Sequence, residues 1–470
     1  MDAKEKRGRY LAKNTLIFTL GNIGSKLISF LLIPLYTKCL STGEYGTVDL
    51  ITTIATVAVP MLTLDIGESI MRFGLDKNAN RDENTQIGFL IFLLSTILTL
   101  ALCLILNNFL SFSKYSWYIF FYMVSLAACQ IYQSDLRGKE LLLQYAIASI
   151  LLTFLTALLN ILFLLVLHFG IGGYLSAYTI ADFMVAIYCL FVGKGYRTIG
   201  FQLVKKDHFR EMVNYSFALV PNTFMWWITD SSDRILVTSL LGSAANGIYA
   251  ISYKLPTIVS TVASVFNQAW LYSAVKVENE DDKTDYNNKT LKALTGWSVI
   301  VGLFVLMITK PFLKVMVAQS YYTSWKYTPF LIIGVVYMTL GTFMSTSYMV
   351  HKDSIGFLIS AMFGAIINIV LNLTLIRPFK IYGSALATCV SYISVFLFRY
   401  FHIRKYLKYS ILNMEFIFGS LLLLLSTMIM YTNLTDFICF LTQLFIFFLA
   451  LLSFKRDWVP LVQVILKKII

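Results

Sequence analysis

Residues 141–167 read LLLQYAIASILLTFLTALLNILFLLVL and contain no Asp, Glu, Lys or Arg. A helix crosses the hydrocarbon core of a membrane with about 20 apolar residues, so this stretch is long enough to span it. Five further stretches share the property: 86–113, 115–134, 327–350, 354–376 and 416–435. A β-barrel is not expected, because barrel strands are about ten residues long and alternate in polarity. We therefore expect an all-α polytopic membrane protein.

The composition of the whole chain supports this class. Hydrophobic residues make up 58% of the 470 residues and charged residues 13%, whereas a soluble domain carries about 25% charged residues. Intrinsic disorder is excluded, because it requires low hydrophobicity. The six cysteines show no paired spacing, so a disulfide-bonded scaffold is excluded as well.

Weaker apolar stretches, interrupted by single charges, raise the expected number of transmembrane helices to about fourteen. They lie near 14–37, 46–66, 173–193, 214–241, 247–275, 293–309, 381–401 and 437–454. The first of them is too long for a signal peptide, carries Lys26 and lacks a small-residue cleavage site. It should therefore remain as a membrane anchor.

Lysine and arginine are concentrated in alternate connections between these spans. With the N-terminus in the cytoplasm, the cytoplasmic side collects the basic residues before the first span, around 194–210 and after residue 454. An excess of basic residues marks the cytoplasmic side, so both termini are predicted to be cytoplasmic. The net charge of +13 is then a topological signal. Nucleic-acid binding, which needs a soluble basic module, is not expected.

Two pairs of similar stretches indicate an internal duplication. YTKCLSTGEYGTVD at 36–49 resembles VTSLLGSAANGIYA at 237–250. Residues 157–177 contain Asn160 and end in GIGGYLSA, whereas 365–387 contain Asn368 and end in KIYGSALA. The common offset of about 200 residues predicts two six-helix lobes in the same orientation, as in transporters built from parallel repeats.

The predicted domains follow from this duplication. Residues 1–199 form the first lobe with spans 1–6, and residues 214–403 form the second lobe with spans 7–12. Residues 200–213 mix apolar and basic side chains and are predicted to form an amphipathic linker on the cytoplasmic face. Residues 404–470 hold two C-terminal helices, spans 13 and 14, and an amphipathic tail.

Polar residues inside the spans mark candidate sites, because a charge at the centre of a span costs about 2.5–3.5 kcal/mol on insertion scales. In the first span, Asn22 and Lys26 lie on one polar face. In the eighth span, Lys254 and Thr257 begin a second polar stripe. We predict that both stripes line a substrate cavity. Lysine snorkelling to the interface and helix packing through hydroxyl groups are the alternatives.

The seventh span carries TDSSDR at 229–234. Asp230 and Arg234 are four residues apart and can form an ion pair, and Asp233 lies beside them. Asp233 and Arg234 are therefore candidate substrate-binding residues and Asp230 a candidate ion-pair residue. A purely structural ion pair is the alternative.

A group of three charged residues and one isolated aspartate are further candidates. Asp65, Glu68 and Arg72 share a face at the cytoplasmic end of the second span, where they could gate movement between the lobes or form salt bridges with a purely structural role. Asp182 is the one charged residue of the sixth span. It could bind a proton or an ion, but a hydrogen-bonded packing role is the favoured interpretation.

Catalytic patterns are missing from the sequence. The four histidines share no motif, no Cys/His spacing suggests zinc, and no glycine-rich loop suggests a nucleotide. We therefore expect no enzymatic activity, no cofactor and no metal site.

Three stretches carry a resemblance to a known family. They are LGNIGSKLISFLLIPLYTKCLSTGEYG at 20–46, LDIGESIMRF at 64–73 and DRILVTSLLGSAANGIYAISYKL at 233–255. The chain resembles the polysaccharide-transport (Wzx-type) flippases of the MOP (multidrug/oligosaccharidyl-lipid/polysaccharide) exporter superfamily. The resemblance covers residues 10 to about 403 and is less diagnostic for spans 13 and 14.

The resemblance implies a central cavity between two six-helix lobes and alternating access. The implied substrate is an undecaprenyl-pyrophosphate-linked oligosaccharide, which moves from the cytoplasmic to the outer leaflet for assembly of O-antigen, capsule or exopolysaccharide. A cationic cavity would map to Lys26, Arg234 and Lys254. The implied location is a bacterial inner membrane. Coupling to H⁺ or Na⁺ is expected, as are a polysaccharide polymerase and glycosyltransferases as partners.

Two other transport functions stay open. Fourteen spans, where many members of the family have twelve, also resemble the lipid II-type flippases for cell-wall precursors. A small-molecule exporter of the related multidrug class would favour acidic cavity residues, and Asp182, Asp230 and Asp233 are candidates for these. Lys26 and Lys254 argue against such an exporter.

Overall fold

The computed structural model describes residues 30–76, 79–107, 113–198, 200, 202–278, 280–411 and 413–455. These residues form helices and connecting turns, and no β-strand occurs among them. The chain divides into two compact units, Met1–Trp227 and Ile228–Ile470. Each unit is described below by itself.

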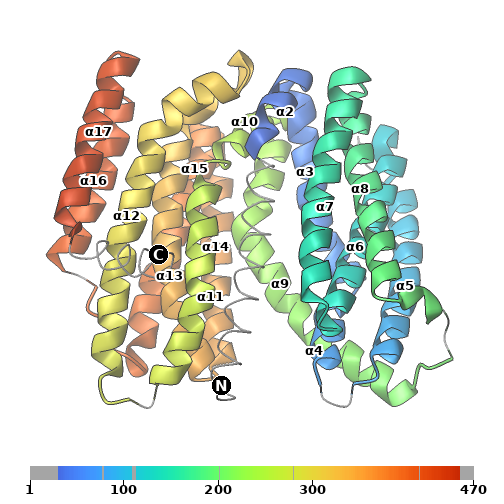
Figure 1. Cartoon of the computed structure of the whole chain (residues 1–470). Helices are drawn as coiled ribbons and strands as arrows, with labels where there is room; N and C mark the ends of the chain where they lie inside the picture. The colour runs from blue at the N-terminus through green and yellow to red at the C-terminus, as the bar shows by residue number, and fades with distance from the viewer. Residues whose placement is uncertain are drawn as a thin grey trace, which may run out of the picture. The chain divides into compact units, whose positions relative to one another are not determined.

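The first unit contains a bundle in which α6 packs against α4, α5 and α8, and α7 packs against α8 (Figure 1). Its helices are α2 (Ile33–Cys39), α3 (Thr42–Leu62), α4 (Ile66–Gly74), α5 (Arg81–Asn107), η1 (Ser113–Tyr115), α6 (Ser116–Gly138), α7 (Leu142–Asn160), the π-helical turn η2 (Ile161–Val166), α8 (Gly170–Val192) and η3 (Gly195–Arg197). Helix α9 (Lys206–Leu241) begins in this unit and ends in the second.

The second unit is built around α13 and α15, which pack against each other, with α14 on α15 and with α16 and α17 on α12 (Figure 1). Its further helices are α10 (Ser243–Ser252), α11 (Pro256–Val277), α12 (Lys283–Met316), η4 (Gln319–Lys326), α13 (Thr328–Val350), α14 (Ser354–Phe379), α15 (Ile381–His402), η5 (Ile403–Lys405), α16 (Met414–Met430) and α17 (Asp436–Ser453).

The described residues contain nine helices that are long and apolar enough to cross a membrane, and α16 is a shorter apolar helix. The expectation of fourteen spans is therefore met only in part. The first expected span, 14–37, lies mostly outside the described residues. The stretches 115–134, 214–241 and 247–275 were also expected to span the membrane. They are helical, in α6, α9, α10 and α11, but these helices are too polar or too short to count among the nine. Helices that pack mainly on other helices do not need an apolar surface all round.

Close backbone contact holds α4 against α6 in the first unit. A Cβ atom added to Gly74 would lie 2.7 Å from the Cα of Gly138, and one added to Gly138 would lie 2.7 Å from the carbonyl oxygen of Ile70. Small residues allow two helices to approach this closely within a membrane. Ile66 and Ile70 then pack with Met212 of α9 in one buried cluster.

The expected linker at 200–213 is not a separate helix. Residues 206–213 form the first turns of α9, which continues through Pro221 to Leu241. The backbone N–H of Lys205 donates to Glu83 over 2.9 Å, and the hydroxyl of Ser69 donates to the carbonyl oxygen of Met212 over 2.9 Å. These contacts attach the segment to the first unit. The amphipathic tail expected at 458–470 lies outside the described residues.

In the second unit, aromatic side chains fill the interface between α11, α13 and α15. Trp270 stacks on Phe343 with ring centroids 4.7 Å apart. The segment that follows α15 also enters this core, because Leu407, Tyr409 and Ile411 are buried in it. The second unit therefore has a hydrophobic core of its own.

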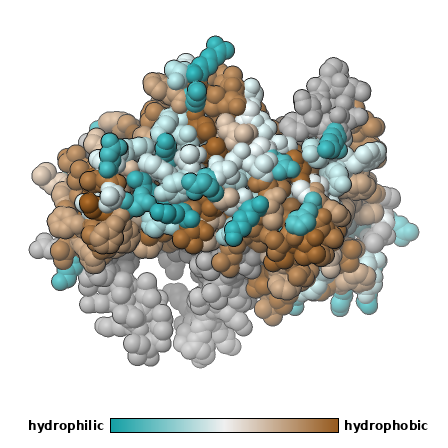
Figure 2. Space-filling view, turned by 90° about the horizontal axis from the view of Figure 1, so that it is seen from above, coloured by the Kyte–Doolittle hydropathy of each residue, from teal (hydrophilic) through white to brown (hydrophobic). Residues whose placement is uncertain are grey.

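The surfaces of the outer helices are apolar. Large exposed hydrophobic side chains include Ile97 on α5, Phe154 on α7, Ile366 on α14 and Phe445 on α17. Figure 2, seen along the helix axes, shows hydrophobic side chains on the flanks and hydrophilic ones at helix ends that face the viewer. Such surfaces suit contact with lipid rather than water.

Candidate functional site

A buried carboxylate organises the polar core of the second unit. Asp233 of α9 is 2% exposed, and its Oδ2 accepts hydrogen bonds from the hydroxyls of Tyr249 at 2.5 Å and Thr388 at 3.1 Å. The hydroxyl of Tyr253 lies 3.4 Å from the same oxygen. Buried carboxylates need such donors, because an unpaired buried charge is strongly unfavourable. Its Oδ1 has no hydrogen-bond partner within the described part of the chain.

Helices α14 and α15 extend this polar core. Asn368 accepts from Ser232 at 3.4 Å and from Asn372 at 3.0 Å. The Asn372 side-chain oxygen in turn accepts from Ser384 at 2.8 Å. Asn368 and Asn372 lie on α14, which packs closely against α15. The network adds a row of oxygen atoms beside Asp233.

The other predicted residues of α9 have separate partners. Asp230 is exposed and accepts a hydrogen bond from Tyr392 at 2.9 Å. Arg234 is half-buried, and its guanidinium carbon lies 5.5 Å from the centroid of the Tyr253 ring. Tyr392 of α15 is thus a hydrogen-bond partner of Asp230, and the Asp230–Arg234 ion pair that the spacing of four residues allows stays a prediction.

Lys254 lies in a break between α10 and α11. Pro256 begins α11 and has no backbone N–H, so it cannot donate to the carbonyl oxygen of Ser252 one turn earlier. The hydroxyl of Thr328 donates to that oxygen instead, over 3.2 Å, and the hydroxyl of Ser252 donates to Ser324 over 3.0 Å. The predicted polar stripe therefore belongs to two helices, α10 and α11, that are separated by a short break. Lys254 is half-buried in this break. Discontinuous helices are common around transporter binding sites.

The hydroxyls of the stripe bond to their own helix. Thr257 donates to the carbonyl oxygen of Lys254 over 2.6 Å, and Thr261 donates to that of Thr257 over 2.6 Å. Their oxygen lone pairs remain able to accept a hydrogen bond. Thr257 is half-buried beside Lys254.

The residues predicted to act together at the end of the second span have different partners. Asp65 precedes α4 with a left-handed backbone (φ 51°) and accepts from Thr223 at 3.2 Å. Glu68 lies 3.7 Å from Arg137 of α6. Arg72 pairs with Asp76 at 2.6 Å on the surface. The predicted common helical face is therefore wrong for Asp65, which lies in the turn before α4, and these contacts do not join the three side chains in one ion-pair cluster.

Asn22 and Lys26 lie outside the described residues, so their place in a cavity stays a prediction. Within the described residues no group of three or more His, Cys, Asp or Glu side chains could hold a metal ion.

Arg399 is a buried cation that sequence reasoning missed. It is among the largest fully buried side chains and donates to Ser360 over 3.1 Å and to the carbonyl oxygen of Gly341 over 3.0 Å. Its position at the end of a span made it resemble an ordinary topological charge. Its partners Ser360 and Gly341 lie on α14 and α13, far from Arg399 in the sequence.

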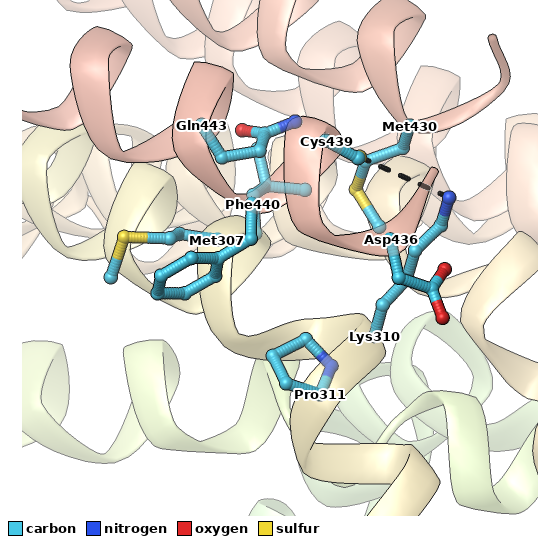
Figure 3. A pocket seen from close by; sticks show the side chains of 9 residues that line it. Met307, Lys310, Pro311, Met430, Asp436, Cys439, Phe440 and Gln443 are labelled. Atoms are coloured by element: carbon cyan, nitrogen blue, oxygen red, sulfur yellow. Dashed lines mark hydrogen bonds between the residues drawn. The ribbon is translucent and has the colours of Figure 1, made fainter. Parts of the chain in front are cut away.

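A small, mostly apolar pocket lies between α12, α16 and α17, and Lys310, Asp436 and Gln443 are the polar residues in its lining (Figure 3). The Lys310 ammonium lies 3.9 Å from the sulfur of Cys439 and 4.3 Å from the centroid of the Trp325 ring. Lys314 donates to Asp436 over 3.1 Å. These contacts make spans 13 and 14 part of the second unit's packing.

The sequence matches the polysaccharide biosynthesis protein family over residues 11–272, more than half of the chain. The chain belongs to this family. It is 23% identical to an uncharacterized membrane protein of Methanocaldococcus jannaschii over 426 residues, which cover 85% of this chain and 100% of that protein.

Two solved structures have a similar fold. The lipid II flippase MurJ in an inward closed conformation aligns with a TM-score of 0.65 and 14% identity, and the alignment covers 96% of this chain and 99% of that one. An inward-facing multidrug resistance MATE family transporter of the MOP superfamily aligns with a TM-score of 0.65 and 11% identity, covering 85% and 95%. This member of the polysaccharide biosynthesis family is therefore a multi-pass membrane protein with the fold of MOP-superfamily transporters, as the sequence resemblance predicted.

Proposed function

We propose that this protein is a flippase that moves an undecaprenyl-pyrophosphate-linked oligosaccharide from the cytoplasmic to the outer leaflet by alternating access. The observation that carries the proposal is the family match, which ties a chain with a transporter fold to polysaccharide biosynthesis. A lipid-linked sugar is the intermediate of such a pathway that must cross a membrane. Surface polysaccharides such as O-antigen, capsule or exopolysaccharide would be its destination.

The charged residues of the second unit support an anionic headgroup. Arg234 and Lys254 are both half-buried, and Lys254 lies in the break between α10 and α11. A pyrophosphate is a multiply charged anion, for which Arg and Lys in a site of low dielectric constant are suitable partners. We propose that Lys26 adds a third cation, with Asn22 and Thr257 as hydrogen-bonding groups for the sugar.

We further propose that Asp233 is where a coupling cation, H⁺ or Na⁺, binds. Its Oδ1 has no partner within the described residues, and the side-chain oxygens of Asn368, Asn372 and Thr388 belong to the same network. Oxygen atoms of this kind are the ligands that hard cations prefer. On this proposal Asp233 serves coupling rather than direct sugar binding.

A flippase for lipid II-type cell-wall precursors is the second candidate. The alignment with the lipid II flippase structure covers 96% of this chain, against 85% for the multidrug transporter. A small-molecule exporter is the third, and the acids Asp182, Asp230 and Asp233 are what favours it. The proposed location is the inner membrane of a bacterium with both termini cytoplasmic, beside a polymerase and glycosyltransferases.

The test is complementation of a host from which the gene has been deleted, followed by analysis of surface polysaccharide and of lipid-linked intermediates in each leaflet. We expect loss of one polysaccharide in the deletion strain, with its lipid-linked unit trapped on the cytoplasmic side. Trapped lipid II would favour the second candidate. Unchanged polysaccharide with new sensitivity to cationic drugs would overturn the proposal and favour an exporter.

The cationic site is tested in the same strain. Lys26→Ala and Lys254→Ala should each reduce export while the protein is still inserted and expressed. Lys289→Ala is the matched control, because Lys289 is 76% exposed in a surface pair with Asp285. Normal export by both cavity variants would contradict the cationic site.

A further inference from the structure

The first unit buries an acidic side chain near the middle of a membrane helix. Asp182 is 3% exposed and lies twelve residues after Gly170, the first residue of α8. At 1.5 Å per residue it is about 18 Å from that end of the helix. An ionisable residue at such a depth is a candidate functional site by default.

Asp182 has few partners. The thiol of Cys129 on α6 is its hydrogen-bonding neighbour, and Tyr122 on α6 also interacts with it. The carboxyl Oδ2 is buried and has no hydrogen-bond partner in the part of the chain that the structure describes. A carboxyl used only for packing would be expected to satisfy both oxygens, because an unsatisfied buried acceptor costs about 1–3 kcal/mol.

A column of tyrosines leads from the end of α8 to this carboxyl. Tyr174, Tyr178 and Asp182 are spaced four residues apart, so they lie on one face of α8. The rings of Tyr174 and Tyr178 stack with centroids 4.7 Å apart. Tyr178 then meets Tyr122 edge-on at 6.2 Å, and Tyr122 interacts electrostatically with Asp182.

The column continues to the turn between α2 and α3. Tyr36 of α2 lies 5.0 Å from Tyr174 between ring centroids, and Tyr45 of α3 lies 6.1 Å from Tyr36. Tyr45 follows Glu44, whose carboxylate caps the start of α3 by accepting from the backbone N–H of Ser41 at 2.9 Å. The column therefore runs from a partly exposed helix end to the middle of the bundle.

These tyrosines are not an ordinary apolar core. Tyr36, Tyr45, Tyr122 and Tyr174 are each less than 8% exposed, so their hydroxyls have been taken out of water. The neighbours of the buried Tyr36 hydroxyl are the hydroxyls of Tyr174 and Tyr178. Phenylalanine would fill the same space without the cost of burying a polar group, which indicates that the hydroxyls have a role besides packing.

We propose that Asp182 is a protonation site of the first unit, and that the tyrosine column carries protons to it from the α2–α3 turn. Each hydroxyl can accept a proton on its oxygen while it gives its own proton to the next hydroxyl or to an intervening water. The net change is one proton removed from the solvent, one carboxylate converted to a carboxylic acid, and every tyrosine restored. The positive-inside rule predicts that this turn faces the outer side of the membrane.

The groups around Asp182 leave its charge without a cationic partner among the described residues. The groups that act on it are the Cys129 thiol and the Tyr122 hydroxyl, both on α6. The half-buried Lys139 is hydrogen-bonded to Asp135 at the far end of α6, at 2.8 Å, and Arg137 lies 3.7 Å from Glu68. The other titratable residues of the helices packed on α8 are Tyr118 and Tyr132 on α6, Glu44, Tyr45 and Asp49 on α3, Tyr145 on α7, and Tyr196 and Arg197 on η3.

The test uses infrared difference spectra of the full chain in nanodiscs, recorded without substrate after a pH jump. The wild-type protein should show a carboxylic-acid C=O band that rises as the pH falls and that Asp182→Asn lacks. Tyr174→Phe and Tyr178→Phe keep the packing and remove one hydroxyl each, so the same band should form several-fold more slowly. If Asp182→Asn still showed this C=O band at full intensity, Asp182 would not be the protonation site.

Tyr188→Phe is the matched control, because Tyr188 lies on α8 beyond Asp182 and outside the column. It should leave the rate of band formation unchanged. Equal rates in Tyr178→Phe, Tyr188→Phe and wild type would overturn the relay, even if Asp182→Asn failed to fold. The inference does not rest on the proposed substrate, since no lipid-linked sugar is present in the experiment.

Discussion

The turn between α6 and α7 in the first unit and the turn between α13 and α14 in the second have the same backbone course. Glu140 and Lys352 both have positive φ, 60° and 55°, and the following residues Leu141 and Asp353 have φ of −83° and −88°. Non-glycine residues seldom adopt positive φ. The two turns therefore share an uncommon local geometry, while the duplication itself stays a prediction from the sequence.

The side chains at these two turns differ. Asp353 caps α14 by accepting from the backbone N–H of Gly356 at 2.8 Å, whereas Leu141 makes no cap and packs into a hydrophobic cluster. The buried carboxylates differ in the same way, because Asp233 accepts several hydroxyls and Asp182 has few partners. The two turns therefore share a backbone shape, and the chemistry of one unit cannot be read from the other.

The largest expected difference concerns the repeated glycines Gly173 and Gly383. A Cβ atom on Gly383 would lie 2.1 Å from the carbonyl oxygen of Leu375, whereas one on Gly173 would lie 2.8 Å from the Cβ of Phe169. Both atoms are held by the backbone, so the closer contact at Gly383 requires the larger shift of the chain. Gly383→Ala should lower the free energy of unfolding by about 3 kcal/mol or more, and Gly173→Ala by less. Thermal unfolding followed by size-exclusion chromatography measures both, and equal losses would contradict the difference in packing.

A smaller difference is expected between the repeated asparagines. Asn368 joins Ser232, Asn372 and Thr388, so Asn368→Ala leaves several buried groups unsatisfied and should destabilise by about 3 kcal/mol. Asn160 donates only to the carbonyl oxygen of Thr156, over 2.8 Å, within the described residues. Asn160→Ala should therefore lose about 1 kcal/mol. The same unfolding assay applies, and a larger loss for Asn160→Ala would show that its Oδ1 has an important partner.

The smallest expected effect concerns the cap itself. The N–H of Gly356, followed by Lys405, holds the pKa of Asp353 down to about 2. A carboxylate with a lowered pKa stabilises the fold above its unfolded pKa of about 3.9 and loses that contribution as the pH falls through the folded value. Asp353→Asn should therefore be slightly less stable than wild type at pH 7, and the gap should shrink from about pH 4 towards pH 2. Leu141→Asn, which removes no charge, serves as the comparison at the equivalent turn, and a pH-independent gap for Asp353→Asn would argue against the charged cap.

Hydropathy and spacing predicted much of the fold and less of the site. Long uncharged stretches such as 141–167 became helices, because an apolar run of that length is stable across a membrane. Spacing placed Asp230 and Arg234 on one face of a helix, but it could not show that Tyr392 of α15 would donate a hydrogen bond to Asp230. Arg399 was missed for the same reason, since its ligands Ser360 and Gly341 come from two other helices.

The sequence by itself determined that this chain is a helical membrane protein and which family it resembles, and it predicted a duplication. These properties depend on composition, on the spacing of apolar residues and on local motifs, and all three can be read from the order of residues along the chain. Only the tertiary structure decided that Asp233 is enclosed by hydroxyls, that Lys254 lies at a break repaired by Thr328, and that five tyrosines from four helices form a column ending at Asp182. Those arrangements depend on which helix faces are brought into contact, and helix packing is fixed by side-chain shape across the whole unit.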